Sequence, residues 1–248
     1  MMKKLIACLM ALCMILSLAA ACAEGITTLE EGKLIYSTSP DFPPFEYRDD
    51  NDEIIGIEPE LIALIAEKIG LTAEPLPMDF DGALLAARVD MGAKADLIVS
   101  GVTVTEERKT IYDFTNPYTT ITQAIVSKDG AVTKDQLNDV IIGVQSGTTG
   151  QIYAEDNFPN VTKYETYSLA FQALQNGQVD CVLLDDAVGG AYVKKIPGLA
   201  SQPTDCEIEE YAFGVNKGNT ALVDAINGAL AELIEDGTVE AIILKYNE

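Results

Sequence analysis

The chain reads DLIVSGVTVTEER from residue 96 to residue 108. The first part of this stretch is a short apolar run, which predicts a buried strand over residues 96–101. Ser100 and Gly101 end the run, and Thr103 and Arg108 follow shortly after it. Ligands of open parallel sheets bind beyond the carboxyl ends of the strands. These four residues are therefore candidates for a binding site.

Strand-like and helix-like segments alternate on both sides of this stretch. Further strands are predicted over residues 33–39, 73–78, 123–128, 140–145 and 180–184, with a hairpin over residues 47–57. Helices are predicted over residues 59–70, 82–87, 150–157, 169–176 and 221–234, with a short one after Gly237. This alternation predicts an α/β fold of parallel β-α-β units with helices on both faces of the sheet.

The first residues have the order of an export signal. Lys3 and Lys4 form a basic tip, residues 5–18 form an apolar run, and small residues follow. We predict a signal peptide over residues 1–23. Two cleavage sites compete: Cys22 resembles a lipobox cysteine that is lipidated after cleavage before it, and residues 21–23 form an A-x-A signal that removes Cys22. The mature protein is expected outside the cytoplasm.

The composition excludes several classes of function. The net charge of -23 disfavours nucleic acid and anionic lipid surfaces as partners. The absence of histidine removes the commonest general base and the commonest transition-metal ligand. Cys181 and Cys206, which remain after the leader, are too few for a zinc site, and a disulfide and a pair of buried thiols both stay open. We expect no metal and no cofactor.

Six stretches occur in an order that is similar to a known family. The chain resembles the amino-acid-binding proteins of ABC transporters, whose fold is the type II periplasmic binding protein. The resemblance covers almost the whole mature chain and rests on residues 38–47, 79–82, 100–108, 113–118, 145–150 and 179–185.

This resemblance implies two Rossmann-like lobes joined by a hinge of two crossings. We expect the first lobe to comprise residues 30–122 and 217–248, and the second to comprise residues 127–213. The crossings are expected near residues 123–126 and 212–216. The family implies that closure of the lobes captures a free amino acid for delivery to an ABC transporter permease, with the protein acting as a monomer.

A free amino acid presents a carboxylate and an ammonium group, and each selects its own partner. A carboxylate suits the planar fork of an arginine, which Arg108 supplies with Thr103 close by. Asp185 ends a predicted strand and suits the ammonium. The resemblance implies these two roles, with the backbone of Ser100 and Gly101 also holding the ammonium. The alternatives are a surface ion pair for Arg108 and a helix N-cap for Asp185.

Other candidates complete the predicted ligand site. Thr148 and Thr149 open a predicted helix, whose first N–H groups favour an anion, and the resemblance implies contact of Thr149 with the ligand carboxylate. Gln145 is expected nearer the ligand side chain. Phe42 and Phe80 are expected to form aromatic walls on the two sides of that side chain.

Ser39 is a further candidate, and it bears on the identity of the ligand. It stands where several relatives that bind cationic or amide side chains carry aspartate, so we expect the site to lack an additional acidic group for a basic side chain. Because the candidates that face the ligand are mostly Ser, Thr, Gln and Phe, a polar neutral amino acid is favoured, with cystine and basic amino acids left open.

Two other functions are weighed against transport. Some relatives of this fold are cyclohexadienyl dehydratases, which need a general acid such as Glu46, Asp79 or Asp185. A sensory module that signals to a receptor is the second alternative. We expect a binding protein and not an enzyme.

Overall fold

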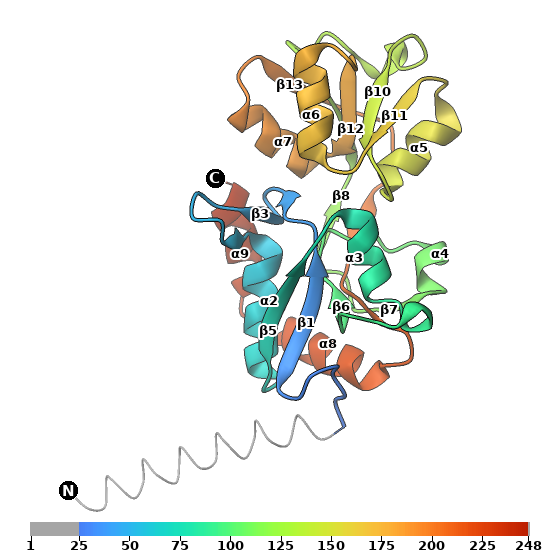
Figure 1. Cartoon of the computed structure of the whole chain (residues 1–248). Helices are drawn as coiled ribbons and strands as arrows, with labels where there is room; N and C mark the ends of the chain where they lie inside the picture. Colours follow the sequence, from blue (N-terminus) through green and yellow to red (C-terminus); the bar gives the residue numbers. More distant parts are fainter. Residues whose placement is uncertain (1–24, 248) are drawn as a thin grey trace, which may run out of the picture.

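The computed structural model describes residues 25–247, so the predicted signal peptide with Cys22 lies outside the described residues. Figure 1 shows two halves, one above the other, with the chain passing between them. Each half is built on one five-stranded sheet with helices packed against it. This arrangement confirms the predicted α/β class.

The first sheet has the strand order β5-β1-β6-β15-β7. Its strands are β1 (Lys33–Thr38), β5 (Thr72–Pro77), β6 (Leu97–Ile98), β7 (Tyr112–Phe114) and β15 (Gly214–Asn216). β1 runs parallel to β5 and β6, whereas β15 runs antiparallel to β6 and β7. The helices of this half are α2 (Ile57–Lys68), α3 (Phe80–Ala86), α4 (Glu106–Lys109), α8 (Thr220–Glu235) and α9 (Thr238–Asn247), with the short 3-10 turn η1 (Val89–Met91).

The second sheet has the order β11-β10-β12-β9-β13. Its strands are β9 (Gln123–Lys128), β10 (Ile142–Gln145), β11 (Val161–Tyr164), β12 (Cys181–Asp185) and β13 (Leu199–Pro203). β10 is parallel to β11 and β12, and β9 is antiparallel to β12 and β13. The helices of this half are α5 (Thr149–Asn157), α6 (Tyr167–Asn176) and α7 (Asp186–Lys195), with η2 (Lys134–Gln136). Both sheets are thus mixed, not wholly parallel as the alternation predicts.

The crossings between the halves lie earlier than predicted. Residues 123–128 form a full strand of the second sheet, and residues 214–216 belong to the first. The chain passes between the halves at β8 (Thr119–Ile121) and β14 (Glu209–Tyr211), which pair antiparallel. Whether the two halves move as the predicted lobes stays a prediction.

A small sheet of β2 (Asp41–Phe42), β3 (Glu46–Arg48) and β4 (Ile54–Ile55) contains the predicted hairpin. Gly56 ends it with a φ of 134°, and a Cβ there would lie 2.2 Å from the carbonyl oxygen of Phe45. Only glycine allows this turn, after which α2 begins at Ile57. The turn sets the start of α2 against the hairpin, where the N–H of Glu58 donates to the carbonyl oxygen of Phe45 at 3.0 Å.

Cys181 and Cys206 are free thiols, the first buried in β12 and the second partly buried. Within residues 25–247, no cluster of three metal-ligating side chains occurs, and no helix is long and apolar enough to cross a membrane.

Candidate ligand-binding site

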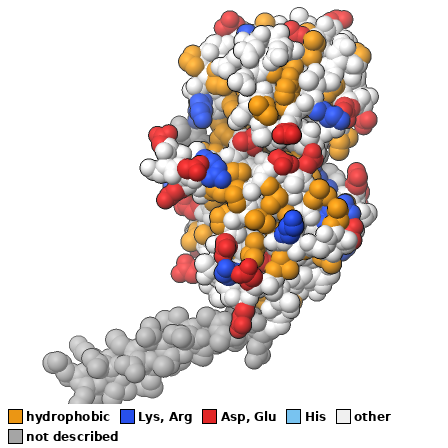
Figure 2. All heavy atoms as spheres, viewed as in Figure 1, with side chains coloured by type: hydrophobic (Ala, Val, Ile, Leu, Met, Phe, Trp, Pro, Cys, Tyr) orange, Lys and Arg blue, Asp and Glu red, His pale blue; other side chains and the backbone are white. Residues whose placement is uncertain are grey.

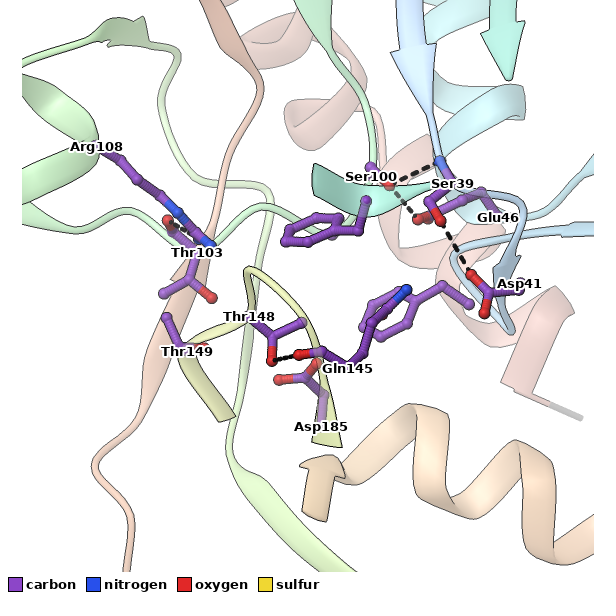
Figure 3. Close-up of a pocket in the computed structure, with 13 residues that line it drawn as sticks. Ser39, Asp41, Glu46, Ser100, Thr103, Arg108, Gln145, Thr148, Thr149 and Asp185 are labelled. Atoms are coloured by element: carbon purple, nitrogen blue, oxygen red, sulfur yellow. Dashed lines mark hydrogen bonds between the residues drawn. The ribbon is translucent and has the colours of Figure 1, made fainter. Parts of the chain in front are cut away.

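A cavity lies between the two halves, at the carboxyl ends of β1, β6, β10 and β12 (Figure 3). All eleven residues predicted from the sequence line it: Ser39, Phe42, Phe80, Ser100, Gly101, Thr103, Arg108, Gln145, Thr148, Thr149 and Asp185. Two further lining residues, Asp41 and Glu46, are missing from the predicted set. The structure brings these side chains together, and their contact with a ligand stays a prediction.

Arg108 enters the cavity from α4 and is only 9% exposed. Its Nη1 donates to the carbonyl oxygen of Thr103 at 2.8 Å, and its Nη2 donates to that of Gly147 at 3.0 Å. The guanidinium lies over the ring of Phe80, with 5.8 Å from Cζ to the ring centroid. Burial lowers the pKa of Arg108, against the opposing charges of Glu209 and other acids.

No carboxylate among residues 25–247 forms an ion pair with Arg108. The structure therefore does not support the alternative in which it serves as a surface salt bridge. A buried guanidinium with unused N–H groups is a receptor for an anion.

Asp185 faces the cavity from the end of β12 and is 5% exposed. It occupies the N-cap position of α7 but makes no side-chain cap hydrogen bond, and Asp186 instead accepts the N–H of Ala187 at 2.8 Å. The amide of Gln123 donates to Asp185 Oδ1 at 2.6 Å. Burial, followed by the charge of Glu209, raises the pKa of Asp185 to about 7. An ammonium group placed here would favour the ionised form.

Two of the three threonines of the site are held by a residue that the sequence analysis does not identify. Glu209 Oε2 accepts the hydroxyl of Thr103 at 2.6 Å and that of Thr149 at 2.7 Å. Each hydroxyl donates its only proton to Glu209. What each threonine can still offer a ligand is a hydroxyl lone pair and its backbone N–H group. Glu209 lies on β14 and also accepts the amide of Gln123 at 3.1 Å. It thereby links the two halves behind the cavity.

The helix that begins at Thr149 forms the anion seat in the second half. Thr148 caps it, because its hydroxyl oxygen accepts the N–H of Gln151 at 3.0 Å. Gly147 precedes the cap with a φ of 79°, and a Cβ there would lie 2.2 Å from Asp81 Oδ1. The free N–H groups of the first turn and the helix dipole favour an anion beside Arg108.

Two aromatic rings form walls of the cavity. Phe42 stacks on Tyr167 of the second half, with ring centroids 5.6 Å apart, and packs so closely on Gly101 that a Cβ there would lie 2.5 Å from its ring. Phe80 lies under Arg108 at the start of α3. Both rings line the cavity.

Acidic side chains lie on the Ser39 side of the cavity (Figure 3). Asp41 accepts the hydroxyl of Ser39 at 3.0 Å and the N–H of Tyr167, the first residue of α6, at 2.8 Å. Glu46 is fully buried and accepts the hydroxyl of Ser100 at 2.9 Å. The expectation that the site lacks an acid for a basic side chain is therefore wrong. Two carboxylates, from Asp41 on β2 and Glu46 on β3, line the cavity together with Ser39.

A cavity between two α/β halves, with a cation and an anion from different halves, defines a solute-binding protein. The model of the bacterial extracellular solute-binding proteins, family 3, matches residues 34–248. The chain belongs to this family, as the sequence resemblance predicts.

Curated relatives give the same family. The chain is 32% identical to a putative ABC transporter arginine-binding protein 2 of Escherichia coli K12, over 93% of each chain. It is also 32% identical to the L-cystine-binding protein TcyJ of the same strain, over 88% of this chain and 83% of the relative. An ancestral arginine-binding protein solved with arginine superposes with a TM-score of 0.81 at 39% identity, covering 87% of this chain and 98% of that one.

Proposed function

We propose that the protein captures a free basic amino acid, with arginine as the preferred ligand, and delivers it to an ABC transporter permease. The observation that carries this proposal is the arrangement of charges in one cavity. A guanidinium and a helix N-terminus provide for a carboxylate, Asp185 provides for an ammonium, and Asp41 and Glu46 provide for a second cation.

The bound pose follows from these partners. The ligand carboxylate pairs with Arg108 and with the backbone N–H groups of Thr103 and Thr149, while its α-ammonium pairs with Asp185. The aliphatic part of its side chain lies between Phe42 and Phe80, and the terminal guanidinium points towards the acidic turn. The names of the arginine-binding relatives support this choice of ligand.

Closure of the two halves accounts for capture. Arg108, on α4, and Asp185, at the end of β12, belong to different halves, so one zwitterion can bridge them only when the halves are together. Direct hydrogen bonds between the halves also support the closed form. Asp41 accepts the N–H of Tyr167 on α6, and Arg108 donates to the carbonyl oxygen of Gly147. Ligand binding shifts the population towards closure because it adds contacts that the open form lacks.

The surface of the protein favours a cationic ligand. Figure 2 shows acidic side chains gathered where the two halves meet on one face. Such a field raises the local concentration of a cation and its rate of association. We propose an extracytoplasmic monomer that meets its permease outside the cell membrane, with Cys22 as a possible lipid anchor. The family and its named relatives are solute-binding proteins, and the proposal requires no catalysis.

Isothermal titration of the mature protein with arginine, lysine, histidine, glutamine and cystine tests the proposal. Arginine is expected to bind most tightly. At a free arginine concentration of 100 times its Kd, the free energy of unfolding should rise by about 2.7 kcal/mol. Tighter binding of glutamine or cystine than of every basic amino acid would contradict the assignment.

A further inference from the structure

Two buried carboxyl groups meet beneath the cavity. Glu46, on β3, lines the cavity, and Glu58, on α2, lies beside it, because the two carboxyls accept hydrogen bonds from the consecutive residues Ser100, at 2.9 Å, and Gly101, at 3.0 Å. Both side chains are fully buried. Two carboxyl groups can bond to each other only when one of them carries a proton, so this contact stores a proton.

The surrounding donors indicate which group carries that proton. Glu58 accepts the hydroxyl of Tyr118 on one oxygen and the N–H of Gly101 at 3.0 Å on the other, as suits an anion. Glu46 accepts only the hydroxyl of Ser100 through Oε1, and its buried Oε2 has no donor. A proton on Glu46 Oε2, donated to Glu58, satisfies both groups.

Among residues 25–247, the side chains that act most strongly on this pair are acidic or neutral, although Arg108 lines the same cavity. They are Asp41 on β2, Tyr36 on β1, and Tyr118 and Ser100, already bonded to the two carboxyls. Burial, followed by the charge of Glu58, raises the pKa of Glu46 well above its usual value. The pair therefore holds one proton more than two ordinary carboxyls do at neutral pH.

We propose that the Glu46–Glu58 pair is a cation subsite that holds a proton when the cavity is empty and exchanges it for the side-chain cation of the ligand. Entry of the ligand guanidinium places a positive charge beside Glu46. The Oε2–H bond breaks, the proton passes to the solvent buffer, and Glu46 becomes the counter-ion of the ligand. This inference rests on the proposed binding of a basic amino acid.

Asp185 can also release a proton when the α-ammonium binds, so the exchange needs a comparison between ligands. Arginine and citrulline have the same backbone groups and nearly the same shape, but the citrulline side chain is neutral. Proton release at Asp185 is common to both ligands. The difference between the numbers of protons released by the two ligands therefore reports only on the end of the cavity that holds the ligand side chain.

The experiment is isothermal titration of the full mature protein at pH 7 in buffers of different ionisation enthalpy. Arginine is expected to release about one proton more per site than citrulline. Equal proton numbers would overturn the exchange while leaving arginine binding intact. Absence of arginine binding would overturn both the proposed function and the exchange.

Variants of the pair add an independent measurement. In Glu58→Gln, Glu46 loses its neighbouring charge and ionises more easily, so the additional proton is expected to vanish while arginine still binds. The matched control is Glu67→Gln, on the exposed side of the same helix, which should keep the difference of one proton. Persistence of that difference in Glu58→Gln would refute the assignment to this pair.

If citrulline binds too weakly to titrate, the pH dependence of arginine affinity provides the test of proton exchange. Because a proton competes with the ligand cation, affinity should rise with pH while Glu46 is protonated. The slope of log affinity against pH is expected to be larger by about one in the wild type than in Glu46→Gln, which is a tenfold change per pH unit. Identical slopes would overturn the exchange.

Discussion

Replacing Arg108 by lysine keeps the positive charge in the cavity but removes the fork of donors. Two of the five N–H groups of Arg108 already bond to the carbonyl oxygens of Thr103 and Gly147. The remaining three can bind a carboxylate in the bidentate manner. A lysine has three N–H groups in total, so after the same two bonds it has one left.

The expected loss is therefore one charge-assisted hydrogen bond to the ligand carboxylate. Hydrogen bonds to charged groups contribute about 1.5–3 kcal/mol. At about 1.4 kcal/mol per factor of ten, Arg108→Lys should weaken binding by about 10- to 150-fold. The loss should be similar for arginine and for any weaker ligand, because every amino acid presents the same carboxylate.

Isothermal titration of the wild type and Arg108→Lys measures this ratio directly. Arg88→Lys is the matched control, because Arg88 lies in the same half and pairs with Asp90 near the surface. That variant should bind within about twofold of the wild type, as expected for an exposed pair. An affinity of Arg108→Lys within threefold of the wild type would refute the carboxylate assignment.

Three further perturbations test the rest of the site. Asp41→Asn removes the charged partner of the α6 N-terminus, which is worth about 1 kcal/mol, so the Kd for arginine should rise at least about fivefold in titration. An unchanged Kd would contradict a role in closure. Glu209→Gln removes the charge and leaves one acceptor oxygen, so the two threonine hydroxyls and the Gln123 amide cannot keep their separate acceptors. Arginine binding should weaken about tenfold, whereas tighter binding would show that Glu209 competes with the ligand. Burial raises the pKa of Asp185 to about 7, so the folded protein binds this proton more tightly than the unfolded chain does. Between about pH 4 and pH 7, urea unfolding of the ligand-free protein should therefore show stability falling relative to Asp185→Asn as pH rises, and a rise would contradict the assignment.

The residues that the sequence predicts share a local signal. Ser100, Thr103 and Gln145 follow or end short apolar strands, and the carboxyl ends of such strands meet at one edge of a sheet. Strand ends are thus visible as changes in hydrophobicity along the chain. The short strands β8 and β14 have no such signal, because three residues with mixed polarity establish no periodicity.

The acidic residues are harder to predict for a different reason. Glu209 acts through Thr103, 106 residues away, and Asp41 acts through Tyr167, 126 residues away. Neither separation corresponds to a helical or strand repeat, so no local pattern marks these contacts. In the sequence, Glu209 is one of 39 acidic residues. Tertiary contacts alone distinguish it from the solvated majority.

The same contacts separate the carboxylates of the cavity from the many carboxylates on the surface of this acidic protein. Most carboxylates lie on the surface, where water screens them, and they act together as a weak field. Those in the cavity are buried, and each is matched with a different partner: Asp41 with a helix N-terminus, Glu46 with a second carboxyl and Asp185 with an amide. Burial raises the pKa of Glu46 and of Asp185, so a positive charge nearby favours the ionised form of each group. Under the proposed function, a ligand with two cationic groups at the correct separation would supply both charges, and one with a single cation would leave Glu46 protonated. Selectivity for a basic amino acid would then follow from the cost of ionising buried acids, which the total charge of the chain does not determine.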